Sequence, residues 1–367
     1  MPQNDRSTFG TDTSRRTLLK FLGTGAAALG ATGLLSACGG GGSAAEAKPG
    51  AITSMGIASA PGDVYLMDEI AQKNKIFANH SIKSEKLIYP QSGVQGMQLL
   101  TAGAINAMQQ DTLMTFTAFA RGTKGTRPKI IGMRMPTITY SIVVNKNFKG
   151  ADASASFEEK MKSLEGKTVG VTAIGSGSEL QLHLALQMAG MKPDAATSLA
   201  VGQFSPMIAQ MNANRVDAVV TQTWATGRLL AQLTGGTLYV ELADPSVPDL
   251  ISGQEVGPLI VREDWIDSNP EAIKNFLAVQ TETKDWMLAN KKESADHLNA
   301  ISFDGKAADL SLSYVEDWAA KVVPKMDPSW KMSRESFDRM NEVGIRLGTL
   351  KKGEVKYEDI VADFAQA

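Results

Sequence analysis

The chain has 367 residues, with 37 Lys and Arg, 39 Asp and Glu, and a formal net charge of −2. A nearly neutral chain with no basic cluster is not expected to bind nucleic acid. The single cysteine, Cys38, excludes an intrachain disulfide, thiolate chemistry and any cysteine-based zinc or iron–sulfur site.

The first 37 residues predict export. Ser14-Arg15-Arg16-Thr17-Leu18-Leu19-Lys20 is typical of a twin-arginine signal, and a glycine-diluted apolar run follows over 21–35. That run is too short and too rich in glycine to span about 30 Å of hydrocarbon comfortably. Leu35-Ser36-Ala37-Cys38 resembles a bacterial lipobox, so we expect residues 1–37 to be removed and Cys38 to carry lipid. Residues 38–50 then form a flexible tether outside the cytoplasmic membrane.

The first half of the mature region alternates short apolar segments with amphipathic ones. This alternation is typical of an α/β protein with mostly parallel sheets, and about 310 residues are expected to divide into two lobes. The expected strands are 52–57, 82–88, 105–108 and 129–133, and the expected helices are 64–74, 94–101 and 112–121.

The second half repeats this order. The expected strands are 167–171, 197–201, 216–220 and 238–242, and the expected helices are 178–188, 223–233 and one that starts at Ser205-Pro206. Ile105-Asn106-Ala107 matches Val216-Asp217-Ala218, with a threonine five residues after each alanine. Two similar βα lobes would give this repetition, although a common α/β rhythm would give the same impression.

From about residue 256 the pattern becomes helical. A strand over 256–261 precedes a predicted capping box at Ser268-Asn269-Pro270-Glu271, which opens a helix to about Ala289. Further helices are expected at 293–301, 308–322, 334–347 and 357–364, and their apolar positions recur at helical spacing. We interpret this region as structure that covers the core.

The strongest candidate for ligand contact is Gly175-Ser176-Gly177-Ser178, which joins a strand to a helix. In open α/β sheets, ligands bind outside the carboxyl ends of the strands, where helix N-termini point amides outward. Glycines permit close approach and hydroxyls donate hydrogen bonds, so an anionic head group would fit here without arginine. The alternative is an ordinary glycine loop that caps a helix.

Other candidates follow other strands. Two loops offer backbone and side-chain hydrogen-bond donors. Residues at strand ends could either cap a helix or contact a ligand. Aromatic side chains could form walls or simply pack in the core. These candidates are Ser59 and Ala60; Gln91, Ser92 and Gly93; Asp111, Thr112 and Thr223; and Tyr140, Phe204 and Trp224.

Several segments carry a family likeness. Leu164-Glu165-Gly166-Lys167-Thr168-Val169-Gly170-Val171, the loop at 175–178, Phe204-Ser205-Pro206-Met207 and the segment 264–271 occur in the order seen in ABC-importer substrate-binding proteins. The chain resembles the branch that includes sulfonate, taurine, nitrate and thiamine-precursor binders, over essentially all of 51–367. Asn106 departs from the pattern, which often has Asp there.

The resemblance implies a type II periplasmic-binding-protein fold, with two α/β lobes joined by two hinge crossovers near 139–143 and 254–259. Lobe 1 would comprise 51–140 and its return 257–367 with the C-terminal helices, and lobe 2 would comprise 141–256. Such a protein closes on one small ligand and presents the closed form to a membrane permease. The expected molecule is a monomer that needs no cofactor.

The sequence therefore predicts a solute-binding lipoprotein that delivers a small, anionic organic ligand to an ABC importer. An enzyme on the same fold is one alternative, but His80, His183 and His297 show no metal-ligand spacing and no catalytic triad pattern occurs. No catalytic or metal-binding residues are predicted. A ligand-sensing partner of a receptor is a second alternative, with the same cleft and the same anchor.

Overall fold

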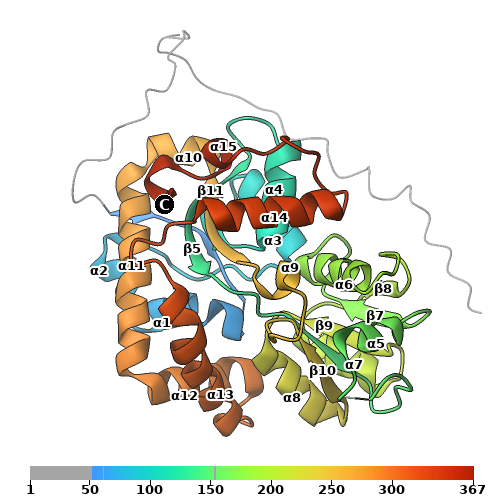
Figure 1. Cartoon of the computed structure of the whole chain (residues 1–367). Coiled ribbons are helices and arrows are strands. Elements are labelled where there is room, and N and C mark those ends of the chain that lie inside the picture. The colour runs from blue at the N-terminus through green and yellow to red at the C-terminus, as the bar shows by residue number, and fades with distance from the viewer. Residues whose placement is uncertain (1–51, 61, 153) are drawn as a thin grey trace, which may run out of the picture. The chain divides into compact units, whose positions relative to one another are not determined.

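The computed structural model describes residues 52–60, 62–152 and 154–367, all within one compact unit (Figure 1). The export signal, the lipidation of Cys38 and the tether at 38–50 lie outside the described residues and stay predictions. In the part of the chain that the structure describes, no helix has both the length and the apolar character needed to cross a membrane.

One sheet has four strands in the order β2-β4-β11-β5. Strand β2 runs parallel to β4, whereas β11 runs antiparallel to both β4 and β5. The strands are β2 (Ile57–Ala58), β4 (Ala107–Gln109), β11 (Gly257–Arg262) and β5 (Pro128–Met135). Beside it, β1 (Thr53–Ser54) and β3 (Ile82–Lys83) form a parallel pair.

The other sheet has five strands in the order β10-β6-β9-β7-β8. Strand β7 runs parallel to β8 and β9, and β6 runs antiparallel to β9 and β10. The strands are β10 (Thr237–Glu241), β6 (Ser141–Val144), β9 (Ala218–Thr221), β7 (Thr168–Val171) and β8 (Thr197–Ala200). Most of these strands are buried on both faces, as expected for sheets covered by helices.

The two sheets repeat one topology, since β2-β4-β11-β5 corresponds in order and direction to β7-β9-β6-β10. The side chains directly before the matching strands β4 and β9 make equivalent hydrogen bonds. Asn106 accepts a hydrogen bond from the Gly56 amide at 2.8 Å, and Asp217 accepts one from the Thr168 amide at 2.8 Å. The residue correspondence predicted from the sequence thus has a structural basis, and Asn106 performs the role that Asp217 performs.

The chain passes twice between the sheets. It leaves β5 and enters β6 through residues 136–140, and it returns from β10 to β11 through residues 242–256. We call the four-stranded sheet with its helices the first lobe and the five-stranded sheet with its helices the second lobe. In Figure 1 the green and yellow segments of the second lobe gather on one side.

Helices cover both sheets. Those of the first lobe that precede the first passage are α1 (Leu66–Lys73), α2 (Ile76–Asn79), α3 (Gly93–Thr101) and α4 (Thr112–Arg121), after a short 3-10 turn η1 (Asp63–Tyr65). Between the two passages the chain forms α5 (Phe157–Lys162), α6 (Gly177–Met188), α7 (Phe204–Asn212), α8 (Trp224–Thr234) and α9 (Asp249–Ser252).

The C-terminal region packs mainly on the first lobe. Helix α11 lies against α1, and α14 lies against α4, where the rings of Phe116 and Phe337 are 5.1 Å apart. Helix α13 also contacts α8 of the second lobe. The helices are α10 (Glu263–Ser268), α11 (Pro270–Ala289), α12 (Lys291–Phe303), α13 (Ala308–Asp317), α14 (Arg334–Arg346) and α15 (Tyr357–Ile360), with short turns at Trp318–Val322, Val323–Lys325 and Asp363–Ala365.

Some predicted elements differ at their ends. The expected strand 52–57 is divided into β1 and β2, and the expected strand 82–88 is reduced to β3 and a single bridge at Ile88. The predicted capping box at 268–271 is wrong, because Ser268 ends α10 and no side chain caps α11. A capping box does form at Ser156 and Glu159, before α5.

Candidate functional site

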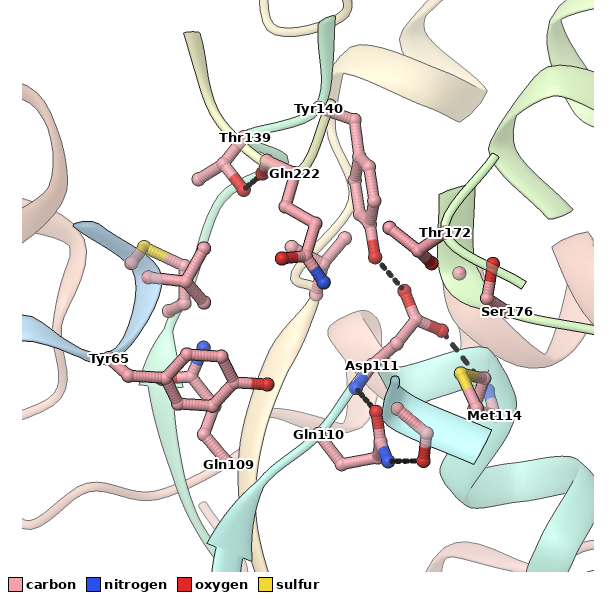
Figure 2. Close-up of a pocket in the computed structure, with 15 residues that line it drawn as sticks. Tyr65, Gln109, Gln110, Asp111, Met114, Thr139, Tyr140, Thr172, Ser176 and Gln222 are labelled. Carbon is pink, nitrogen blue, oxygen red and sulfur yellow. Dashed lines mark hydrogen bonds between the residues drawn. The ribbon is translucent and has the colours of Figure 1, made fainter. Parts of the chain in front are cut away.

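A cavity lies between the two lobes, at the carboxyl ends of β4, β7 and β9 (Figure 2). Its volume is about 30 Å³, so the lobes lie nearly closed on it, and both lobes and both passages contribute to its wall. Its lining is Val64, Tyr65, Gly93, Gln109, Gln110, Asp111, Met114, Met135, Thr139, Tyr140, Thr172, Ser176, Gly177, Gln222 and Val256. Its position agrees with the general rule for ligand sites in open α/β sheets.

Asp111 is the ionisable carboxyl of this lining. It caps α4, since its Oδ1 accepts a hydrogen bond from the Met114 amide at 3.1 Å. Its Oδ2 accepts a second bond from the hydroxyl of Tyr140, also at 3.1 Å (Figure 2). Burial raises the pKa of Asp111 to about 6, and hydrogen bonds from Met114, Tyr140 and the backbone of Leu113 oppose that shift. A buried carboxylate with unused acceptor capacity therefore faces the cavity.

Gly177 begins α6 directly opposite this carboxylate. A Cβ atom at Gly177 would lie 2.7 Å from Asp111 Oδ2 and would overlap the hydroxyl of Tyr140. Because only glycine permits this approach, the first turn of α6 can lie against the Asp111–Tyr140 pair of the opposite side. The contact joins the second lobe to the first across the cavity.

Hydroxyl groups of the second lobe form a small network beside Gly177. Ser178 accepts a hydrogen bond from the Thr172 amide at 3.0 Å, and its oxygen lies 2.9 Å from that of Ser176. The Gly175 amide donates to the Glu179 carboxylate at 2.6 Å. The loop that the sequence suggests for an anion thus already satisfies part of its donors within the protein.

Two tyrosines and three glutamines supply most of the remaining polar groups. Gln110 donates from its side chain to the Gly93 carbonyl at 2.8 Å and accepts from the Asp111 amide at 2.9 Å. Figure 2 shows the hydroxyl of Tyr65 and the amide of Gln222 pointing toward the space in front of Asp111. Groups that both donate and accept hydrogen bonds therefore surround one carboxylate.

No lysine, arginine or histidine is among the residues that line this cavity. The nearest buried cation, Arg134, is 1% exposed and is held by the two oxygens of Asp68 at 2.7 and 2.8 Å. It also donates to the Gln109 side chain at 2.6 Å. Arg134 is thus paired with a carboxylate of the first lobe, and it contacts the lining residue Gln109 without lining the cavity itself.

A second hollow adjoins the cavity, since Thr172 lines both. It is formed by loops of the two lobes and by the end of α12. Its lining is Ala60, Tyr89, Pro90, Gln91, Ser92, Thr172, Ala173, Gly202, Gln203, Phe204, Ser205, Pro206, Ile301, Ser302 and Asp304. Nearby, burial raises the pKa of Glu69, which accepts a hydrogen bond from Ser59 at 3.0 Å.

The structure brings together many of the residues that the sequence singles out. The cavity contains Gly93, Asp111, Tyr140, Ser176 and Gly177, and the second hollow contains Ala60, Gln91, Ser92 and Phe204. Six others line neither of these two spaces: Ser59, Thr112, Gly175, Ser178, Thr223 and Trp224.

Physical reasons explain these six positions. Thr112 is fully buried and donates to the Glu255 carbonyl, while Thr223 caps α8. Of the two alternatives for Trp224, a ligand wall or core packing, its environment fits core packing, because it is 6% exposed and packs against Tyr314 with 5.8 Å between ring centroids. Ser59 and Ser178 bond to neighbouring protein groups, and Gly175 borders a different surface hollow.

Sequence reasoning missed several lining residues, among them Tyr65, Gln109, Gln110, Thr139 and Thr172. Gln109 and Gln110 had a detectable signal, since two amides directly precede Asp111 at the end of a strand. The sequence around Tyr65 and Thr139 carries no such signal. Their positions depend on the first passage and on the turn before α1, which sequence periodicity does not specify.

The chain is similar to a known protein family and to curated binding proteins. The model of the NMT1-like family matches residues 64–302. A curated relative from Brucella abortus (strain 2308), named as a binding protein, is 24% identical over 233 residues, or 62% of this chain. The chain covers 64% of that relative, which is less than two thirds of its length.

Solved structures show the same fold at low identity. The alkanesulfonate-binding protein SsuA from Xanthomonas axonopodis pv. citri has a TM-score of 0.66 and 14% identity, covering 86% of this chain and 98% of its own. The ligand-binding component of an ABC-type import system from Staphylococcus aureus has a TM-score of 0.63 and 12% identity, covering 84% and 96%. The predicted type II periplasmic-binding-protein fold is confirmed.

An enzyme shares this architecture. The desulfurization enzyme DszB has a TM-score of 0.56 and 13% identity, covering 85% of this chain and 97% of its own. Within the described residues, no group of three His, Cys, Asp or Glu side chains is placed to hold a metal ion.

Proposed function

Because the chain belongs to the NMT1-like family, we propose that it is the solute-binding component of an ABC importer. The observation that carries this proposal is the polar cavity that both lobes enclose. A ligand held by residues from both sides favours the closed form, and a permease can recognise that form. The roles of the structurally similar alkanesulfonate-binding protein and import-system component agree with such a function.

The same proposal includes a membrane-anchored location that faces the periplasm or the cell exterior. The twin-arginine pattern and the lipobox at 35–38 support export and a lipid on Cys38, with residues 38–50 as the tether. The test is lipid labelling of cells that express the chain or its Cys38→Ser variant. We expect label on the parent and none on the variant, and label on neither would contradict the anchor.

Ligand capture is tested by thermal unfolding of the full chain carrying Cys38→Ser. The panel contains sulfonates, nitrate, aromatic carboxylates and pyrimidines. A ligand at 100 times its Kd stabilises the folded state by about 2.7 kcal/mol, which gives a visible rise in Tm. A compound that binds and is recovered unchanged supports a receptor.

The enzyme alternative rests on the likeness to DszB. The panel distinguishes it, because an enzyme would convert a bound compound into product. Mass analysis of each compound after incubation therefore separates the two functions. A permease partner is tested by co-purification with a membrane complex, and its absence would favour a sensor role.

A further inference from the structure

Building on the proposed receptor function, we infer that the ligand presents a hydrogen-bond-donating nitrogen, as in an amine, amidine or amino-heterocycle, to the carboxylate of Asp111. The sequence alone favours an anionic ligand. The arrangement of charge in the cavity points to the opposite chemistry.

The first reason is the acceptor capacity of Asp111. An ionised carboxylate accepts about four hydrogen bonds, and Asp111 has one from Met114 and one from Tyr140. The backbone of Leu113 also donates to Asp111, which leaves acceptor capacity on a carboxylate that lines the cavity. A buried carboxylate of this kind is stabilised by further N–H donors.

The second reason is the absence of a cation to receive an anion. The lining holds no Lys, Arg or His, and Arg134 is already bound by Asp68 and Gln109. A sulfonate or carboxylate in this cavity would lie beside Asp111 without a counter-charge. Repulsion between like charges is strong at low dielectric, so this arrangement disfavours anions.

The third reason concerns the helix N-termini that would otherwise attract an anion. The carboxylate of Asp111 itself faces the start of α6 at Gly177. The carboxylate of Glu179 accepts a hydrogen bond from the Gly175 amide. At the start of α8, the carboxylate of Asp63 accepts hydrogen bonds from Thr223 and Thr226. Protein carboxylates therefore lie close to both of these helix N-termini, which makes them less favourable for a ligand anion.

The remaining wall suits a small, polar molecule. Tyr65 and Tyr140 contribute rings and hydroxyls, and Gln110 and Gln222 contribute amides. These groups both donate and accept, so they accommodate neutral parts of a ligand around the nitrogen that Asp111 selects.

The pH dependence of binding separates the two ligand classes. Among the lining groups, Tyr65 has a pKa raised by burial to about 12 and that of Tyr140 is raised well above its usual range, so both stay neutral. Beyond the lining, Glu255 lies on the second passage, and Asp68 and Arg134 neutralise each other. Asp111, with a pKa near 6, is the lining group that changes charge between pH 5 and 7.

The experiment uses the full chain with Cys38→Ser and matched pairs of probes. Benzamidine, benzylamine and 4-aminopyrimidine are compared with benzoate, benzenesulfonate and nitrate. Each compound that raises Tm is titrated calorimetrically at pH 5, 6, 7 and 8. We expect the nitrogen donors to bind, with affinity rising about tenfold from pH 5 to 7 as Asp111 ionises.

Asp111→Asn provides the second measurement. Asparagine keeps the shape of the side chain and its ability to cap α4, so the fold is retained. We expect affinity for a nitrogen donor to fall at least tenfold and its pH dependence to flatten. The matched control is Asp217→Asn, because Asn106 performs the equivalent role in the first lobe, and this variant should keep the parent's affinity.

The outcomes separately test the ligand's charge, the role of Asp111 and the receptor function. Binding of the anions, strengthened in Asp111→Asn, would overturn the charge assignment and leave the receptor function intact. Binding of amines that Asp111→Asn leaves unchanged would overturn the role of Asp111. If no probe of either class raises Tm, the receptor function itself is contradicted.

Discussion

The hydroxyl of Thr223 in the second lobe donates a hydrogen bond to the carboxylate of Asp63 in the first lobe. The same Asp63 oxygen accepts from the Thr226 hydroxyl at 3.1 Å and from its amide at 3.3 Å. Asp63 is 3% exposed, and its own carbonyl accepts from Tyr314 at 2.8 Å. One carboxylate thus fastens the turn before α1 to the start of α8, next to the cavity.

Asp63→Ala should open the two lobes relative to each other. The change removes the acceptor of three hydrogen bonds and leaves the hydroxyls of Thr223 and Thr226 without their partner, which costs about 1–3 kcal/mol. We expect a lower Tm and a larger radius of gyration by small-angle scattering. Asp152→Ala is the control, since Asp152 is exposed and its carboxylate accepts hydrogen bonds from the nearby Ser154. An unchanged radius of gyration would show that the hydrogen bonds of Asp63 do not hold the two lobes together.

Asp111→Asn should change how stability depends on pH. The folded-state pKa of about 6 lies above the ordinary value of 3.8, so the stabilisation is complete below pH 3.8 and is lost as pH rises through 6. At about 1.36 kcal/mol per pKa unit, the loss approaches about 3 kcal/mol. The variant, which does not titrate, should gain stability relative to the parent between pH 4 and 8. Urea unfolding at each pH measures this, and parallel curves would contradict it.

Gly177→Ala should prevent closure without unfolding either lobe. The added methyl group would overlap the hydroxyl of Tyr140 and approach Asp111 Oδ2 to 2.7 Å, whereas alanine favours the helix itself. We expect loss of ligand binding and a larger radius of gyration with nearly unchanged helical content. Gly62→Ala is the control, because nothing lies within 4 Å of its added carbon and its φ of 167° is ordinary extended backbone. Normal binding by Gly177→Ala would show that this contact does not limit closure.

Trp224→Ala and Ser176→Ala should have different effects, although both were sequence-based candidates for ligand contact. Trp224 is buried against Tyr314, so its loss should destabilise the fold by about 3–5 kcal/mol. Ser176 lines the cavity, so its loss should lower affinity by about 1–3 kcal/mol at nearly constant Tm. Calorimetric titration with a bound probe and thermal unfolding of both variants test this difference. A Trp224→Ala variant with the parent's Tm would contradict the packing argument.

Arg134→Met should strongly destabilise the first lobe. The substitution leaves Asp68, which is 1% exposed, without its ion pair, and such a loss costs about 3–5 kcal/mol. Adding Asp68→Leu removes the unpaired charge and should restore most of the stability. Urea unfolding of both single variants and the double variant gives the coupling energy. Additive effects would show that the pair is not coupled.

The order of strands and helices was predictable because local patterns of apolar residues indicate each element. The break between β1 and β2 was not, because it depends on a bond from the Gly56 amide to Asn106, which lies 50 residues further along the chain. Local patterns also fail at the predicted cap of α11. There the preceding residues form α10 instead of a free loop.

The candidate site was predictable only in part. Strand-end loops identified Asp111, Ser176 and Gly177, because topology places such loops at one edge of a sheet. The charge of the cavity was not predictable, since it depends on Arg134 pairing with Asp68, 66 residues away. Similarly, Trp224 is covered by Tyr314 of the distant helix α13, and no local sequence pattern predicts this contact.

The position of β11 determines the order in which the lobes can be completed. All five strands of the second lobe lie between residues 141 and 241, whereas the sheet of the first lobe lacks its β11, between β4 and β5, until residue 262 is made. A growing chain can therefore finish its second lobe while the earlier one still waits for a central strand. Such long-range pairing slows folding, so the first lobe is expected to form last although its chain is synthesised first.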